Sequence, residues 1–307
     1  MMIPAGIHPV LYSFFDGQDR IDRAAMARQV DHCIGAGAHG ITVLGLVTEV
    51  HKMDVTERLA LVEMVGELIG GRVPYAVTVC EPSARAQTDF ARAARRCGAD
   101  WVILQPPAIK GASETDLIRL FGSVADALDM PVAVQNNPVN LEVSLSVTGL
   151  VALNRQHPNI AILKGEGWSI DIARTIDASG GAYSVMGGHG GIEFPALLRS
   201  GGRGLIPAPD FLAAQVRIFD LWQEGSEASR AEAWAIHRRI LPAIVFMSRS
   251  LPGMLCYGKR LFAAQAGIVA WHDRGPALEP TEFGLAEVAR HRAEIASALQ
   301  PARASAQ

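Results

Sequence analysis

The 307-residue sequence contains only four cysteines and no excess of charge of either sign. Cys33, Cys80, Cys97 and Cys256 lie far apart in the chain. No two of them have the Cys-x-x-Cys spacing of zinc and redox sites, so we interpret them as buried thiols. The formal net charge of −3 leaves no basic face for a polyphosphate backbone, which argues against nucleic acid as a partner.

Long apolar runs are also missing. No segment has 18 uninterrupted apolar residues, and the opening MMIPAGIHPV has neither a positively charged region nor a long apolar stretch. We therefore expect a cytoplasmic protein that does not engage a membrane. No Gly-x-Gly-x-x-Gly follows the first apolar run, which disfavours a dinucleotide-binding sheet. Apolar residues still make up 49% of the chain, enough to bury one large core.

The sequence does contain a repeated alternation of helix-like segments and short apolar runs. GAGAHGITVLG (35–45) and SGGRGLIPAP (200–209) each indicate a helix closed by glycine and followed by a buried strand. Asp54 followed by Glu57 predicts a capped helix start. Eight buried strands separated by helices predict an α/β protein with a (β/α)8 TIM barrel. The predicted strands lie at about 6–12, 40–45, 74–80, 101–105, 131–135, 160–164, 182–187 and 203–207.

After the eighth strand the pattern changes to helices only. We expect a barrel domain over residues 1–224 and a C-terminal helical extension packed on it over residues 225–300. Residues 301–307 are polar and rich in alanine, and we expect them to be frayed. The helices are predicted at about 210–224, 228–249, 253–267 and 281–298.

In such a barrel the functional groups lie at the C-terminal ends of the strands. Lys164 is unusual among them, because NIAILKGEG (159–167) places an ammonium at the end of a buried run. Burial favours a neutral amine that can attack a carbonyl, whereas a structural lysine would extend to solvent or pair with Glu166. The other polar residues at predicted strand ends are Thr48, Glu49, Gln105, Gln135, Asn136, Asn137, Glu166 and His189.

Three of these side chains have two interpretations each. Glu166 is either a base or hydroxyl-binding group, or a structural charge near a helix N-terminus. Glu49 either takes part in chemistry or anchors its own loop. His189, between two pairs of glycines, either faces the pocket as an acid or lies in a solvent-facing loop.

Four segments together resemble the motifs of one family. VLGLVTEVHKMDVTERLALV (43–62) is similar to a Gly-Thr-Thr-Gly-Glu loop with its capped helix, and MPVAVQNNP (130–138) to Pro-x-x-x-Tyr-Asn-x-Pro. HPNIAILKGEG (157–167) resembles a Schiff-base lysine strand, and GGHGGIEFPALLRSGGRGLI (187–206) a Gly-Asp-Asp segment. In their order and spacing they resemble the dihydrodipicolinate synthase and N-acetylneuraminate lyase family of class I aldolases, over nearly the whole chain.

This resemblance implies that Lys164 forms an imine with a small 2-keto acid. The imine itself acts as the electron sink, so no metal or organic cofactor is required. The family also implies a homo-oligomer, a tetramer or a dimer. Lys164, Gln135 and Glu166 are then the predicted catalytic residues. The predicted substrate-binding residues are Val47, Thr48, Gly188, His189, Ile206 and Asn140.

The departures from the family motifs narrow the range of reactions that we expect. Gln135 stands where the family has its catalytic tyrosine, and an amide can hydrogen-bond a substrate but cannot shuttle a proton. Leu46 and Val47 replace the two threonines that bind pyruvate, so backbone N–H groups are left to hold the carboxylate, and the Thr48 hydroxyl could add a contact. Asn140 replaces the arginine that holds the aldehyde carboxylate in dihydrodipicolinate synthesis, which makes that reaction a poor candidate.

The 2-keto-3-deoxyarabonate dehydratases of the same superfamily resemble the chain more closely at these positions. That branch has Ser-Glu after strand two, glutamine at strand five and Lys-x-Glu at the Schiff base. Here the corresponding residues are Thr48-Glu49, Gln135 and 164–166 (Lys-Gly-Glu). The sequence therefore favours a Schiff-base-forming lyase that acts as a 2-keto-3-deoxy sugar acid dehydratase.

Two alternatives stay open. One is a pyruvate-dependent aldolase, similar to dihydrodipicolinate synthase or N-acetylneuraminate lyase. The other is a barrel that binds a keto acid without turning it over. Retention of Lys164 argues against the second, because a binding site has little use for a buried amine.

Overall fold

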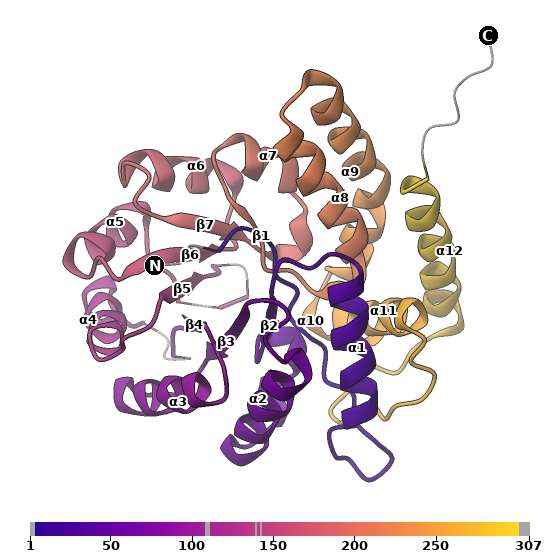
Figure 1. Cartoon of the computed structure of the whole chain (residues 1–307), viewed down its shortest axis with the longest axis horizontal. Helices are drawn as coiled ribbons and strands as arrows, with labels where there is room; N and C mark the ends of the chain where they lie inside the picture. Colours follow the sequence, from indigo (N-terminus) through magenta and orange to yellow (C-terminus); the bar gives the residue numbers. More distant parts are fainter. Residues whose placement is uncertain (1–3, 108–110, 139, 142, 301–307) are drawn as a thin grey trace.

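The computed structural model describes residues 4–107, 111–138, 140–141 and 143–300. The segment 301–307, which we expected to be frayed, lies outside these residues. Eight strands, all parallel to their neighbours, form one curled sheet in the order β1-β8-β7-β6-β5-β4-β3-β2 (Figure 1). Each predicted strand is present. They are β1 (Gly6–Ile7), β2 (Ile41–Val43), β3 (Tyr75–Val79), β4 (Trp101–Leu104), β5 (Val132–Asn136), β6 (Ile160–Gly165), β7 (Ser184–Gly187) and β8 (Gly204–Leu205).

The first strand is much shorter than the predicted 6–12. Hydrogen bonds on the β8 side nevertheless continue past Pro9, because the His8 N–H donates to the Leu205 carbonyl (2.9 Å) and the Val10 N–H to the Pro207 carbonyl (2.7 Å). The same segment also pairs with the opposite edge of the sheet. Val10 forms a parallel bridge with Thr42 of β2, the Leu11 N–H donates to the Thr42 carbonyl (2.9 Å), and the Thr42 N–H donates to the Pro9 carbonyl (2.8 Å). These contacts connect the two outer strands of the curled sheet.

The helices of the alternating region lie outside the sheet (Figure 1). The helix after β2 begins with the predicted capping box, in which Asp54 accepts from the Glu57 N–H (2.8 Å) and Glu57 accepts from the Asp54 N–H (3.2 Å). The helices are α1 (Arg23–Gly35), α2 (Val55–Ile69), α3 (Ala84–Arg96), α4 (Glu114–Ala125), α5 (Val147–Gln156), α6 (Ser169–Ala178), α7 (Phe194–Arg199) and α8 (Leu212–Glu224).

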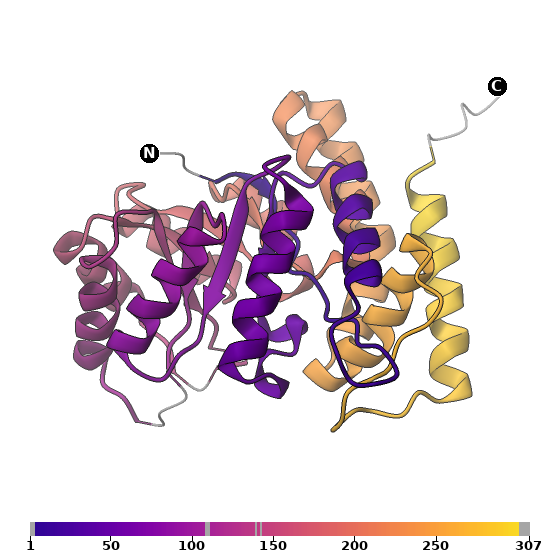
Figure 2. The same ribbon diagram turned by 60° about the horizontal axis from the view of Figure 1, so that its bottom comes forward.

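The C-terminal region is helical, as predicted, and stands along one side of the sheet (Figure 2). The predicted helix at 253–267 is in fact three consecutive pieces, with a π-helical turn in the middle. The elements are α9 (Glu227–Met247), α10 (Leu251–Gly253), η5 (Met254–Gly258), α11 (Lys259–Ala266) and α12 (Glu282–Ala298). No single helix of the described chain is long and apolar enough to cross a membrane; α9 and the 251–266 segment meet the criterion only as a pair bent by 107°.

Candidate active site

Lys164 lies near the end of β6, beside Gln135 of β5, with which it is in register. The Lys164 side chain is buried, with 3% of its surface exposed. Both residues line a cavity of about 60 Å³ at the carboxyl ends of the strands. By the same measure one water needs about 10–15 Å³, so the cavity admits a small molecule. The remaining lining residues on the sheet side include Val10, Leu46, Val47, Asn140, Glu166, His189 and Ile206.

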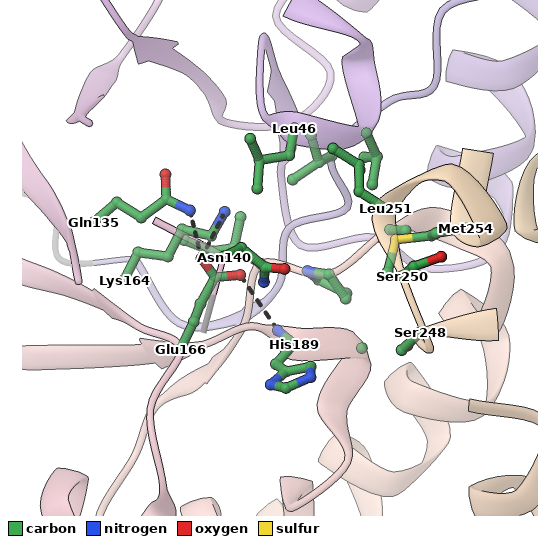
Figure 3. A pocket seen from close by; sticks show the side chains of 16 residues that line it. Leu46, Gln135, Asn140, Lys164, Glu166, His189, Ser248, Ser250, Leu251 and Met254 are labelled. Atoms are coloured by element: carbon green, nitrogen blue, oxygen red, sulfur yellow. Dashed lines mark hydrogen bonds and ion pairs between the residues drawn. The ribbon is translucent and has the colours of Figure 1, made fainter. Parts of the chain in front are cut away.

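The carboxylate of Glu166 is at the centre of the polar contacts in this cavity (Figure 3). Its Oε2 accepts hydrogen bonds from the amides of Gln135 and Asn137, the latter at 2.8 Å, and its Oε1 accepts from the His189 N–H at 3.3 Å. The Lys164 Nζ lies 3.7 Å from Oε2, longer than a hydrogen bond. Donors to both oxygens therefore fix the carboxylate next to the amine.

Gly188 makes room for that carboxylate. A Cβ at position 188 would lie 2.2 Å from Glu166 Oε1, a distance at which no side chain can be placed. Gly188 itself does not line the main cavity; it lines a neighbouring hollow that shares Glu166 and His189 with it. Gly188 therefore contacts the Glu166 carboxylate and does not line the cavity next to Lys164.

Gln135 presents an unused acceptor. Its side chain is buried, its amide N–H₂ faces Glu166, and its Oε1 forms no hydrogen bond with any described residue (Figure 3). A buried acceptor without a partner costs about 1–3 kcal/mol, which a donor on a bound molecule would recover. The position that the resemblance assigns to the family tyrosine therefore holds a buried carbonyl oxygen without a hydrogen-bond partner among the described residues.

Asn140 and His189, two of the predicted substrate-binding residues, line the cavity, and both are held by their neighbours. The Asn137 Oδ1 accepts from the Asn140 N–H at 3.0 Å and from its amide at 3.3 Å. The backbone of His189 has φ 51°, which is uncommon for a residue with a side chain and is stabilised here by its N–H bond to Glu166. Ile206 and Val47 contribute apolar surface to the same cavity.

Thr48 lies outside the cavity, unlike the other predicted residues of its loop, η1 (Leu46–Thr48). Its fully buried hydroxyl donates to the Leu11 carbonyl at 2.7 Å, and its N–H donates to the Gly45 carbonyl at 3.0 Å. Thr48 therefore fastens the loop to the chain after β1 and does not reach the substrate space. Among the described residues, the N–H groups of Leu46 and Val47 have no acceptor, so these two are free to bind an anion.

Glu49 anchors this loop, which was one of its two interpretations. One carboxylate oxygen pairs with Lys259 of α11 and the other with Lys52 at 2.6 Å. Lys259 is 1% exposed, and Lys52 also donates to the Arg274 carbonyl at 2.6 Å. Lys259 was not predicted from the sequence. The only sequence feature that marks it is its place on the apolar face of a helix, three residues before the buried Phe262.

The opposite side of the cavity comes from the C-terminal region, which the sequence analysis also did not anticipate. Ser248, Ser250, Leu251 and Met254 lie there, around the end of α9 and the start of α10 (Figure 3). These residues follow β6 by more than 80 positions and form no recognisable motif. No sequence motif indicates that these four residues lie near Lys164.

The cysteines show no grouping that could bind a metal. All four are free; Cys33 and Cys256 are buried, and burial raises the pKa of both thiols. Cys80 and Cys97 are partly exposed, so the prediction that all four are buried is wrong for these two. Within the described residues no three His, Cys, Asp or Glu side chains are arranged to hold a metal ion.

Comparison with known proteins places this geometry in a family. The model of the dihydrodipicolinate synthetase family matches residues 3–277. The chain is 27% identical to a 4-hydroxy-tetrahydrodipicolinate synthase from Pelobacter propionicus over 78% of its own length and 81% of the relative. It is 28% identical to an L-2-keto-3-deoxyarabonate dehydratase from Azospirillum brasilense, over 78% of each chain.

A solved structure has the same fold. YagE from Escherichia coli K12, a prophage protein of the dihydrodipicolinic acid synthase family solved in complex with pyruvate, superposes with a TM-score of 0.86. The match covers 97% of this chain and 99% of YagE at 24% sequence identity. Together with the family match, this shows that the chain belongs to the dihydrodipicolinate synthetase family, whose members are lyases.

Proposed function

We propose that the protein is a Schiff-base-forming lyase acting on a small 2-keto acid, with Lys164 as the nucleophile. The observation that carries the proposal is a buried amine lining a small cavity next to a fixed carboxylate. The amine attacks the C2 carbonyl and water leaves, which gives a protonated imine. The imine then accepts the electrons of a C3–H bond, so that an enamine forms as the proton departs.

The cavity offers a group for each part of such a substrate. The N–H groups of Leu46 and Val47, which have no acceptor among the described residues, would bind the carboxylate. Glu166, 3.7 Å from the amine, is placed to take the C3 proton. The pyruvate complex of YagE supports a small keto acid as the ligand of this fold.

Within this class we favour dehydration of a 2-keto-3-deoxy sugar acid. Once the enamine has formed, its electrons expel the C4 hydroxyl, which leaves as water after taking a proton. This route needs a hydroxyl positioned over the cavity, and the unpaired Gln135 Oε1 can accept from one. The dehydratase from Azospirillum brasilense among the relatives supports this preference. For a pentonate, loss of a C5 proton and return of a proton to C3 then convert the C3–C4 double bond into the enol of a C5 aldehyde. Hydrolysis of the imine releases the 2-keto acid semialdehyde and restores Lys164.

Retro-aldol cleavage is the second candidate, since the same imine can break the C3–C4 bond. That step requires a base to take the proton of the C4 hydroxyl, and the family tyrosine is replaced by Gln135. Glu166 is the one carboxylate among the described lining residues of the cavity, so it would have to serve as that base. The two reactions are separated by incubating the protein with a 2-keto-3-deoxy pentonate. A 2-keto acid semialdehyde of the same carbon number indicates dehydration, whereas pyruvate indicates cleavage.

The broader architecture is part of the same proposal. We infer that the curled sheet closes as a (β/α)8 barrel over residues 1–224, with residues 225–300 as an extension packed on it. The bridge between Val10 and Thr42 and the match to YagE support closure. Assembly into a homo-oligomer and a cytoplasmic location stay predictions.

Gln135→Tyr should lower turnover of a 2-keto-3-deoxy sugar acid by about 10- to 1000-fold. The change removes the free Oε1 acceptor and one amide that fixes Glu166, and it places a ring in a small cavity. Imine formation should survive because the amine is unchanged. Single-turnover kinetics that follow water loss and pyruvate release separately check this. If the natural protein mainly releases pyruvate and the tyrosine accelerates that release, the dehydratase preference is wrong.

The protein should have little dihydrodipicolinate synthase activity with pyruvate and aspartate semialdehyde. Asn140 is neutral and cannot supply a bidentate cationic clamp for the aldehyde's carboxylate. No arginine is present among the described residues that line the cavity. A coupled assay on this pair measures the activity directly. A turnover number within the common enzyme range of about 1–1000 per second would contradict the inference.

A further inference from the structure

The cavity has two walls of different chemistry, supplied by distant parts of the chain. One wall carries Lys164, Glu166 and Gln135 at the ends of β5 and β6, and the other comes from the turn between α9 and α10 (Figure 3). On that second wall, Leu251 and Met254 are apolar, and Ser248 and Ser250 are the only polar side chains among the residues that the structure describes. A substrate held through its keto group at Lys164 extends across this space, so the second wall meets its far end.

Ser248 has a hydroxyl available for such a contact. It caps the C-terminal end of α9 through its backbone, with its N–H donating to the Ile244 carbonyl at 2.9 Å. Its side-chain hydroxyl forms no hydrogen bond with any residue that the structure describes. The loop that carries His189 lies directly against it, because a Cβ at Gly190 would be 2.6 Å from the Ser248 Oγ. The absence of a side chain at position 190 therefore leaves this hydroxyl at the cavity edge.

Ser250 is partly committed elsewhere. Its Oγ accepts from the Gly253 N–H at 3.1 Å and caps α10, so one role of this oxygen is structural. The hydroxyl hydrogen has no acceptor among the described residues. Ser250 can thus donate a hydrogen bond, but replacing it would also remove a helix cap worth about 1 kcal/mol. Ser248 is the better position at which to test recognition.

The charges of the lining residues restrict what the far end of the substrate can be. Lys164 is the one lysine among the described lining residues, no arginine is present, and Glu166 is a carboxylate. A second carboxylate or a phosphate at the far end would find no permanently charged cation among the described lining residues other than Lys164 itself, and such groups are normally paired when buried. Neutral hydroxyls, which both donate and accept, match the serines.

We propose that Ser248, assisted by Ser250, selects substrates that carry uncharged hydroxyl groups beyond the reacting carbons. This inference rests on the proposed function, because it takes Lys164 as the point to which the keto group is attached. Ser248 is then a specificity-determining residue that contacts the substrate and does not take part in imine formation. The C-terminal region consequently sets the substrate class, while the strand ends supply the chemistry.

The test compares two ligands in one assay. Borohydride trapping of the Lys164 imine is measured against concentration for pyruvate, which has no distal hydroxyl, and for a 2-keto-3-deoxy hexonate, which has several. Ser248→Ala should leave the half-saturating concentration of pyruvate unchanged within about twofold. It should raise that of the hexonate by about 3- to 10-fold, the value of one neutral hydrogen bond. Ser248→Cys, which keeps the size of the side chain, should behave like the alanine variant.

A surface serine supplies the matched control. The Ser123 hydroxyl donates to the Leu120 carbonyl of its own helix. Ser123→Ala should therefore change the half-saturating concentration of neither ligand. If Ser248→Ala raised the half-saturating concentrations of both ligands equally, the serine would have a purely structural role and the inference would be overturned. An unchanged half-saturating concentration for the hexonate would also overturn it. Failure of the unaltered protein to trap any 2-keto acid is a different result, because it removes the proposed function itself.

Discussion

Lys164→Ala should abolish turnover of 2-keto acids, with a loss of about 10⁴-fold or more. Without the amine no imine forms, and no other lysine is present among the described residues that line the cavity. Lys164→Arg should fail to the same extent, because a guanidinium stays protonated and cannot attack the carbonyl. Steady-state assays on a 2-keto-3-deoxy sugar acid with each variant measure the effect.

The fold should survive both changes, which separates this result from simple unfolding. After Lys164→Ala, the Glu166 carboxylate keeps its hydrogen bonds from Gln135, Asn137 and the His189 N–H. Circular dichroism and the midpoint of thermal unfolding check that the variants are folded. A folded alanine variant that retains turnover within about tenfold of the natural protein would mean that Lys164 is structural.

Glu166→Gln should lower turnover by about 100- to 10,000-fold while leaving imine formation largely intact. The amide has the shape of the carboxylate but cannot take a proton from C3, and a positioned base contributes about that factor. Rapid-quench single-turnover kinetics, with borohydride trapping of the imine as a separate readout, resolve the two steps. The expected pattern is an imine that accumulates without product.

Glu114→Gln is a suitable comparison, since this carboxylate lies away from the cavity and accepts from Ser146. It should change neither step. If Glu166→Gln slowed imine formation by the same factor as turnover, Glu166 would serve to place the amine and not as the base. Wild-type turnover in a folded Glu166→Gln variant would remove Glu166 from the chemistry altogether.

The alternation of strands and helices could be predicted because its signals are local. Buried runs such as 101–105 and the capping pair of Asp54 and Glu57 each act within a few residues, and the structure confirms both. The first strand, predicted at 6–12, is regular only over Gly6–Ile7, although its hydrogen bonds on the β8 side run on to Val10. How far the chain continues as a regular strand depends on partners distant in the sequence, here Thr42 of β2.

The candidate site was predictable only where its residues follow strands directly. Lys164, Gln135 and Glu166 lie together because β5 and β6 are neighbours in register. The sequence pattern does not show where a side chain points. Thr48 was therefore predicted to contact the substrate, although its hydroxyl donates to the Leu11 carbonyl. Ser248 comes from a helix far along the chain, so only the packing of the C-terminal region brings it to the cavity.

The most direct test of the central claim is mass spectrometry of the natural protein after borohydride reduction with a panel of 2-keto acids. Imine formation by Lys164 predicts one stable adduct per chain, on the peptide that contains Lys164, and a panel ranking led by 2-keto-3-deoxy sugar acids. Lys164→Ala should carry no adduct. Reduction that labels a different lysine, or labelling at full level in the alanine variant, would contradict the account.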